Sequence, residues 1–165
     1  MRIVVIDFET LYSDEYTLSK MSTEAYIRDP RFESYGAAVK WSPSVDARWY
    51  THPELQFHFK QEDWSDAWII CHHAQFDGLI LTHHYDVHPK MWGCTLSMAR
   101  GLLGNHISVS LDSVRKQFGI APKITPYQER KGKHWNELSP AMQQMLADGA
   151  VDEVESKNPD SFRID

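Results

Sequence analysis

The feature that most restricts the fold of this chain is a run of apolar residues near its start. Ile3–Ile6 contains only Ile and Val, and two charged residues, Asp7 and Glu9, follow it at once. β-branched apolar residues without polar alternation are typical of a strand that is covered on both faces. This run therefore predicts an interior strand of a sheet whose two faces are both packed.

The rest of the chain predicts a mixture of strands and helices. Further strands are expected at 37–41, 48–51 and 67–71, and helices at 52–63, 74–84, 95–103, 111–118 and 140–156. Ser110 and Ser139 precede two of the helices as N-caps, and Pro140 suits a first helical position. Residues 120–137 are expected to form a long loop, and long loops of compact domains are often functional. This order predicts one α/β domain over residues 1–165, with mixed strand directions in the sheet.

Composition excludes several classes of protein. The 165 residues include two cysteines, Cys71 and Cys94, so a disulfide framework is excluded and a reducing cytoplasm is expected. No apolar run approaches the ~20 residues of a membrane span, and Met1-Arg2 leads directly into a strand without room for a signal peptide. The sequence therefore predicts a cytoplasmic protein with no membrane partner.

Charge is distributed unevenly along the sequence. The net charge of −6 argues against binding nucleic acid by bulk charge alone. Between Arg115 and His134, however, six basic residues face one acidic residue. This window is either a solvated surface loop or a nucleic-acid contact. In the second case Tyr127 is the expected aromatic contact, and Arg130, Lys131 and Lys133 are expected to meet backbone phosphates.

Carboxylates follow the first strand in a pattern that suits metal binding. Alternation along a strand puts Asp7 and Glu9 on one face, where two like charges repel unless something offsets them. Hard divalent cations with oxygen ligands do so. The alternative is a charged strand end that faces solvent.

Two further acidic positions occur at helices. Asp77 opens the helix after the strand at 67–71, where it could simply be an acid at a helix N-terminus. Asp148 and Asp152 are four residues apart on the last helix and share one face, with Gly149 between them. Both features destabilise a helix, so their presence could mean that a ligand approaches the helix closely at this point. The alternative is an ordinary acidic helix surface.

Taken in order, these acidic motifs resemble those of the DnaQ-like, or DEDD, 3′–5′ exonuclease superfamily. Asp7-Phe8-Glu9-Thr10 resembles the first exonuclease motif, Phe76-Asp77 the second, and Asp152 on the C-terminal helix the third. The likeness covers nearly the whole chain and includes two intervening stretches, Cys94–Ala99 and Ser110–Ile120. Cys94 stands where the family usually has Asp.

Within this superfamily the chain is most similar to the proofreading domain of phage family A DNA polymerases. Met1–Thr10, the segment Tyr26–Phe32 and the tail Asn158–Asp165 look like parts of such polymerases. The resemblance implies a ribonuclease H-like (DnaQ-like) fold, with a mixed five-stranded sheet flanked by helices. It also implies a role in DNA replication, a DNA polymerase as partner, and a host cytoplasm for a phage-encoded protein.

The resemblance implies a two-metal phosphodiesterase that cuts single-stranded DNA from its 3′ end, with Mg²⁺ or Mn²⁺. Asp7 would bridge the two ions, Glu9 and Asp152 would complete the first site, and Asp77 would hold the second ion. Around this centre, three residues are expected to contact the substrate: Thr10, His73 and Phe76. His73 stands where these polymerases often carry Asn.

The sequence departs from the family at the residue that activates water. The superfamily usually has Tyr four residues before the third-motif Asp, or His five residues before it, and here these positions are Asp148 and Ala147. Asp148 is the expected general base in their place. The alternative function is an impaired exonuclease-fold module that binds single-stranded nucleic acid or a polymerase without cutting, and a ribonuclease of the same superfamily is a further alternative.

Two other residue classes have competing interpretations. Five histidines, His72, His73, His83, His84 and His88, lie near Cys71 and could form a zinc site, but no paired cysteine motif accompanies them. The tryptophans and Tyr50 are expected mainly in the core, although aromatic rings could also stack on bases.

Overall fold

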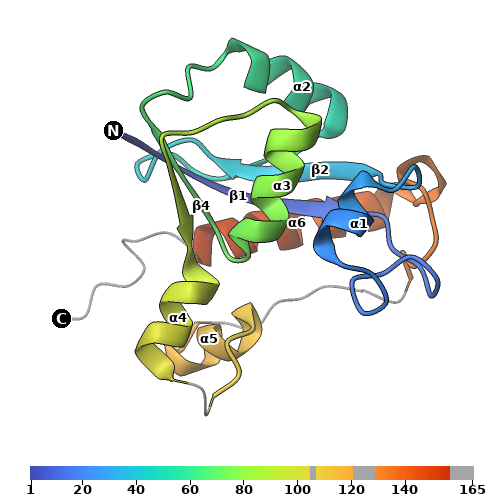
Figure 1. Cartoon of the computed structure of the whole chain (residues 1–165). Helices are drawn as coiled ribbons and strands as arrows, with labels where there is room; N and C mark the ends of the chain where they lie inside the picture. The colour runs from blue at the N-terminus through green and yellow to red at the C-terminus, as the bar shows by residue number, and fades with distance from the viewer. Residues whose placement is uncertain (105–106, 121–128, 157–165) are drawn as a thin grey trace.

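The computed structural model describes residues 1–104, 107–120 and 129–156. It contains a five-stranded mixed sheet in the order β3-β2-β1-β4-β5 (Figure 1). β1 pairs antiparallel with β2 and parallel with β4, so the predicted mixture of strand directions is confirmed. The strands are β1 (Arg2–Thr10), β2 (Ser34–Lys40), β3 (Arg48–Thr51), β4 (Ala67–Cys71) and β5 (Met91–Cys94).

Helices cover both faces of this sheet. They are α1 (Thr23–Arg28), α2 (His52–Gln61), α3 (Ala74–His84), α4 (Thr95–Leu103), α5 (Leu111–Gln117) and α6 (Pro140–Ser156), with a 3₁₀ turn, η1 (Trp135–Glu137), before α6. In Figure 1, α3 lies in front of β1 and β2, and α6 lies behind them. The described helices and strands therefore form the predicted three-layer α/β arrangement.

Alternation along β1 sends its residues into two different cores. Val4 and Ile6 belong to the larger cluster, which also contains Leu55 of α2 and Ile80 of α3. Val5 points the other way and packs with Ala150 and Val154 of α6. Val4, Val5 and Ile6 are at most 2% exposed, which explains why the part of β1 between Arg2 and Asp7 has no polar residue. The same alternation puts Asp7 and Glu9 on the α6 side of the sheet.

Most predicted elements are confirmed, with differences of a few residues at their ends. The Ser110 side chain accepts a hydrogen bond from Ser113 N at 3.3 Å, and Ser139 Oγ accepts one from Met142 N at 3.2 Å, as expected of N-caps. Two elements were not predicted individually. α1 is six residues long, and the four residues of β5 include Gly93, so neither carries a periodic pattern long enough to recognise.

A polar clamp fixes the C-terminal half of α6 against the sheet. The ammonium group of Lys40, which is buried, donates to Glu155 Oε2 at 2.6 Å, and Ala47 N donates to Glu155 Oε1 at 2.5 Å. A buried ammonium needs such a partner, because its desolvation is otherwise uncompensated. The clamp sets how far along β2 the last turns of α6 lie.

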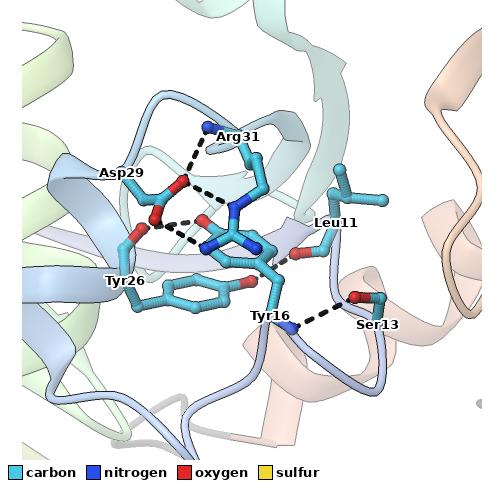
Figure 2. Close-up of polar contacts among 6 residues, drawn as sticks. All are labelled: Leu11, Ser13, Tyr16, Tyr26, Asp29 and Arg31. Atoms are coloured by element: carbon cyan, nitrogen blue, oxygen red, sulfur yellow. Dashed lines mark hydrogen bonds and ion pairs between the residues drawn. The ribbon is translucent and has the colours of Figure 1, made fainter.

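A pair of stacked tyrosines anchors the chain where it leaves β1 (Figure 2). Tyr16 and Tyr26 are parallel with ring centroids 4.3 Å apart, and Tyr16 Oη donates to Tyr26 O at 2.7 Å. Tyr26 Oη donates to Leu11 O and accepts from Thr10 Oγ1, which is 2.9 Å away. Burial raises the pKa of both phenols, so both stay neutral donors.

Arg31 covers the outer side of this pair. Its guanidinium carbon lies 4.8 Å from the centre of the Tyr16 ring, and Nε and Nη2 each donate to Asp29 at 2.8 Å. These hydrogen bonds from Arg31 lower the pKa of Asp29 to about 2. The segment after β1 is thus held by contacts between residues 10 to 16 positions apart in sequence.

None of the helices in the described ranges combines the length and the apolar character that a membrane crossing requires. A cytoplasmic location stays a prediction.

We expect Tyr26→Phe to lower the free energy of unfolding by about 1–3 kcal/mol, because it leaves the buried carbonyl of Leu11 without this donor. For a chain of this size the melting temperature should fall by roughly 2–4 °C per kcal/mol. Urea unfolding measures the change. Tyr50→Phe is the matched control, since its hydroxyl bonds the part-buried Trp41 indole at 3.0 Å and water can replace it. Equal losses in the two variants would contradict the anchoring role of Tyr26.

Candidate metal and nucleic-acid site

Three carboxylates meet where the end of β1 faces α6. One oxygen from each of Asp7, Glu9 and Glu153 lies within 4.8 Å of the other two. Asp7 is half-buried, and the Glu9 and Glu153 side chains are buried. Asp7 and Glu9 pair across the sheet with Ala38 and Gly36 of β2, and Ala38 packs with Ala150 and Val154 of α6. The sheet and α6 together therefore assemble a strongly acidic cluster.

The third carboxylate comes from Glu153 and not from the predicted Asp152. Asp152 is exposed, whereas Glu153 lies on the face of α6 that buries Leu146 and Ala150. The spacing of these residues could have identified Glu153, since it follows Leu146 by seven positions, which is close to two helical turns. The family motif favoured Asp152 because the motif calls for an Asp and takes no account of which face of the helix is buried.

Asp148, predicted as the general base, is also exposed. It accepts a hydrogen bond from Gln144 Nε2 at 2.8 Å, one helical turn away on the outer face of α6. The structure therefore does not bring Asp148 to the carboxylate cluster. Asp152 is four residues after Asp148 and therefore lies on the same face of α6, where it is exposed as well.

Asp77 lines the same cavity as the carboxylates of the cluster. It is buried at the first turn of α3, and the backbone N–H of Phe8 approaches its Oδ1 at 3.4 Å. β1 and β4 run parallel, so the ends of both strands open at one edge of the sheet, where α/β proteins commonly bind ligands. Asp7, Glu9 and Asp77 all line one cavity there, of about 410 Å³, as does Glu153.

A buried arginine contacts the carboxylate cluster. Arg130 Nη1 donates to Glu9 Oε2, and the two side chains are 5% and 6% exposed. The Arg130 guanidinium also lies 5.2 Å from the centre of the Tyr12 ring. The prediction that Arg130 belongs to the site agrees with its place in the cavity lining, but its partner is a carboxylate of the protein.

The predicted substrate contacts Thr10, His73 and Phe76 line the same cavity. The His73 and Phe76 rings are parallel, with their centroids 6.5 Å apart. The pKa of His73 is lowered, because burial disfavours the charged imidazole and Arg100 acts in the same direction. A neutral imidazole and a phenyl ring give the cavity two flat, uncharged surfaces, which suit contact with a nucleobase or a sugar.

Further lining residues were not predicted as contacts. Thr17 and Leu18 come from the segment that the tyrosine pair anchors, and Leu18 is 43% exposed at the cavity. The others are Phe8, Tyr12, Tyr26, His72 and Leu111. The sequence motifs gave none of these residues a contact role, because most of them reach the cavity only through the path of the chain after β1 and β4.

The remaining predicted contacts come from the basic window. Lys131 forms an ion pair with Asp14, and both side chains are largely exposed, so Lys131 is at the surface beside the cavity. Tyr127 lies outside the described residues. The interpretation of this window as a phosphate contact therefore stays a prediction.

The histidines near Cys71 do not gather around one point. His72 bonds Thr95 Oγ1 at 2.9 Å and Val109 O at 3.1 Å, while His84 Nε2 donates to Ile27 O at 2.9 Å. Within residues 1–104, 107–120 and 129–156, Asp7, Glu9 and Glu153 are the group whose ligand atoms are close enough to share a metal ion. The interpretation of the histidines as satisfied structural residues agrees with these bonds.

Comparison with solved structures identifies the fold. An apo form of a nuclease matches with a TM-score of 0.63 and 19% identity, over 94% of this chain and 67% of that one. NrnC of Brucella melitensis matches with a TM-score of 0.59 and 18% identity, over 97% of this chain and 74% of that one. The same protein bound to pGG matches with a TM-score of 0.55 and 16% identity, over 97% and 74% of the two chains.

This chain has the ribonuclease H-like, DnaQ-like fold. At 16–19% identity the likeness shows the fold alone. No family model matches the sequence, and no curated protein is recognisably similar to it. The particular resemblance to phage polymerase proofreading domains stays a prediction.

Replacing Glu153 by Gln should raise the free energy of unfolding by about 1 kcal/mol in buffer with EDTA, because it removes repulsion within the cluster. Asp152→Asn removes the same charge from the exposed neighbouring position and should change stability by less than about 0.5 kcal/mol. Urea unfolding of both variants measures the difference. Stabilisation by Asp152→Asn alone would place the third carboxylate at residue 152.

Proposed function

We propose that this protein is a metal-dependent exonuclease that removes nucleotides from the 3′ end of single-stranded DNA. The observation that carries the proposal is the placement of Asp7, Glu9 and Glu153 within 4.8 Å on the wall of a cavity that also contains Asp77. Buried acids repel one another and are costly to keep ionised, so such a cluster suits a site that binds cations. The fold shared with nucleases supports the same conclusion.

The residues present fit hard divalent cations. Carboxylate oxygens are the ligands that Mg²⁺ and Mn²⁺ favour, and two oxygens bound to one Mg²⁺ are at most about 4.2 Å apart. Ligand atoms within 4.8 Å of one another need only small side-chain rotations to reach that spacing. NrnC, which shares the fold, is known in a form with bound Mg²⁺, at a TM-score of 0.55 and 17% identity over 92% of this chain and 67% of that one.

In this proposal the four acids divide between two metal positions. Asp7, Glu9 and Glu153 would hold one ion, and Asp77 together with Asp7 would hold the second. When bound, the ions supply an activated water and neutralise charge on the phosphate and the leaving oxygen. Glu153 takes the role that the sequence motif gave to Asp152.

The other walls of the cavity position the nucleotide. His73 and Phe76 present flat, uncharged surfaces to the last base or sugar, and Thr10 offers its backbone at the end of β1. The cavity of about 410 Å³ has the volume of a site for one or two nucleotide units rather than for a duplex. The complex of NrnC with pGG supports short single strands as the class of ligand. A DNA polymerase partner remains a prediction from the sequence.

A second function is favoured by the position of Asp148. The predicted general base is on the solvent side of α6, and Gly149 occupies the turn of the helix before Glu153. A protein that keeps the metal-binding acids but lacks an efficient base would bind single-stranded nucleic acid and cut it slowly or not at all. This impaired module is the alternative to an active exonuclease.

Digestion of 5′-labelled single strands tests the function. With Mg²⁺ or Mn²⁺ we expect a ladder of DNA products shortened from the 3′ end, and EDTA should abolish it. A short RNA of the same sequence serves as the second substrate, and a phosphorothioate at the last 3′ linkage tests the direction of cutting. Retarded migration of uncut strands without any products would favour the impaired module.

Substitution of the acids tests which residues act. Asp7→Asn and Glu153→Gln should each lower the rate about a thousandfold or more, because losing several kcal/mol of metal-supplied stabilisation costs tenfold per ~1.4 kcal/mol. Asp152→Asn and Asp148→Asn are matched controls on the exposed face of α6 and should stay within about twofold of the parent. A strong loss in Asp152→Asn with little effect in Glu153→Gln would restore the assignment made from the sequence motif.

A further inference from the structure

Metal binding would account for the four carboxylates of the cavity, but it gives no role to Arg130, the basic side chain that lines the cavity with them. It donates to Glu9 from within the cavity, and both side chains are about 95% buried. We infer that Arg130 is a built-in cation that competes with divalent metal for the carboxylate cluster and thereby lowers its metal affinity. The inference rests on the proposed function, since it concerns the same cluster.

The competition follows from the contacts of Glu9. Arg130 Nη1 uses Oε2 of Glu9, which is one of the two oxygens that this side chain can offer to an ion. A metal that takes both oxygens must break this hydrogen bond, and a metal that takes only the other oxygen must lie beside a positive charge. Either arrangement weakens metal binding, because like charges a few Å apart in a partly buried site repel strongly.

The backbone around Arg130 is held in place, which keeps the guanidinium within reach of the carboxylates. Gly132 N donates to Tyr12 O at 2.8 Å, and Tyr35 Oη donates to Lys133 O at 2.5 Å. Lys133 N closes a turn onto Arg130 O at 3.1 Å. These bonds tie the segment to residues that follow β1 and begin β2, next to the carboxylates. Arg130 therefore stays close to the cluster whether or not Glu9 binds an ion.

The same contact permits the opposite effect, in which Arg130 orients Glu9 as a metal ligand. Outer partners of metal ligands commonly raise affinity, and their loss weakens binding 10- to 100-fold. The two roles thus predict changes of opposite sign on removal of Arg130. Burial of the full positive charge beside three acids favours competition, because a neutral donor would orient Glu9 equally well without repelling the ion.

Calorimetric titration of the full chain with MnCl₂, together with melting temperatures in EDTA and in Mn²⁺, tests the inference. In Arg130→Met we expect the Kd for Mn²⁺ to fall about tenfold, which corresponds to about 1.4 kcal/mol. Its melting temperature in EDTA should fall, since the acids lose their compensating charge, and Mn²⁺ should raise that temperature by more than it does in the parent. Lys133→Met, which removes the same charge from an exposed side chain of the same segment, should leave the Kd within about twofold.

An unchanged or higher Kd in Arg130→Met, with the parent binding Mn²⁺, would overturn the inference and leave the proposed function standing. If the parent gives no heat on titration with Mn²⁺, and Mn²⁺ changes its melting temperature no more than that of Glu9→Gln, the proposed function itself fails. Should Arg130→Met not fold, Arg130→Gln replaces it, because Gln removes the charge but can still donate a hydrogen bond to Glu9. A Kd in Arg130→Gln severalfold below that of the parent supports competition, and one equal to or above that of the parent overturns it.

Discussion

Repulsion between carboxylates is the constraint on which the rest of this structure depends. Asp7, Glu9 and Glu153 are held within 4.8 Å although like charges in a buried place strongly disfavour such an arrangement. Two things offset the cost: Arg130 contributes an opposite charge at Glu9, and the apolar contacts of α6 with the sheet fix the helix regardless of the acids. The fully buried Ala150 and Val154 flank Glu153 on the same helix face, so packing that has nothing to do with charge presents the acid to the cluster.

The fold could be predicted from the sequence because its signals are local. The apolar run of β1, the serine caps and the apolar periodicity of the helices each depend on neighbouring residues, and each corresponds to an element of the structure. The candidate site was predictable where it follows directly from a strand, as with Asp7 and Glu9, or opens a helix, as with Asp77. At α6 the family motif indicated Asp152, whereas the apolar spacing of Leu146 and Ala150 favours Glu153, the acid on the buried face of the helix.

Arg130 shows a different reason for incomplete prediction. A basic residue in a loop is normally expected at the surface, facing phosphates or solvent. Here the hydrogen bonds of Gly132 and Lys133 turn the segment back over the end of β1, which carries Arg130 inside while Lys131 stays outside. The sequence predicted the charge of Arg130 and its position in a loop. Its partner, Glu9, depends on a turn of the backbone that the residue types alone do not indicate.

The separation in sequence of the acids has a consequence for how the molecule forms. Asp7 and Glu9 lie near the first residue of the chain, and Glu153 lies on the last helix that the structure describes. Contacts between such distant segments close slowly, because a long loop of chain must first be ordered. During synthesis, the acids of β1 emerge long before the helix that completes their cluster. The five strands and α3 are therefore synthesised before α6 can bring Glu153 to Asp7 and Glu9.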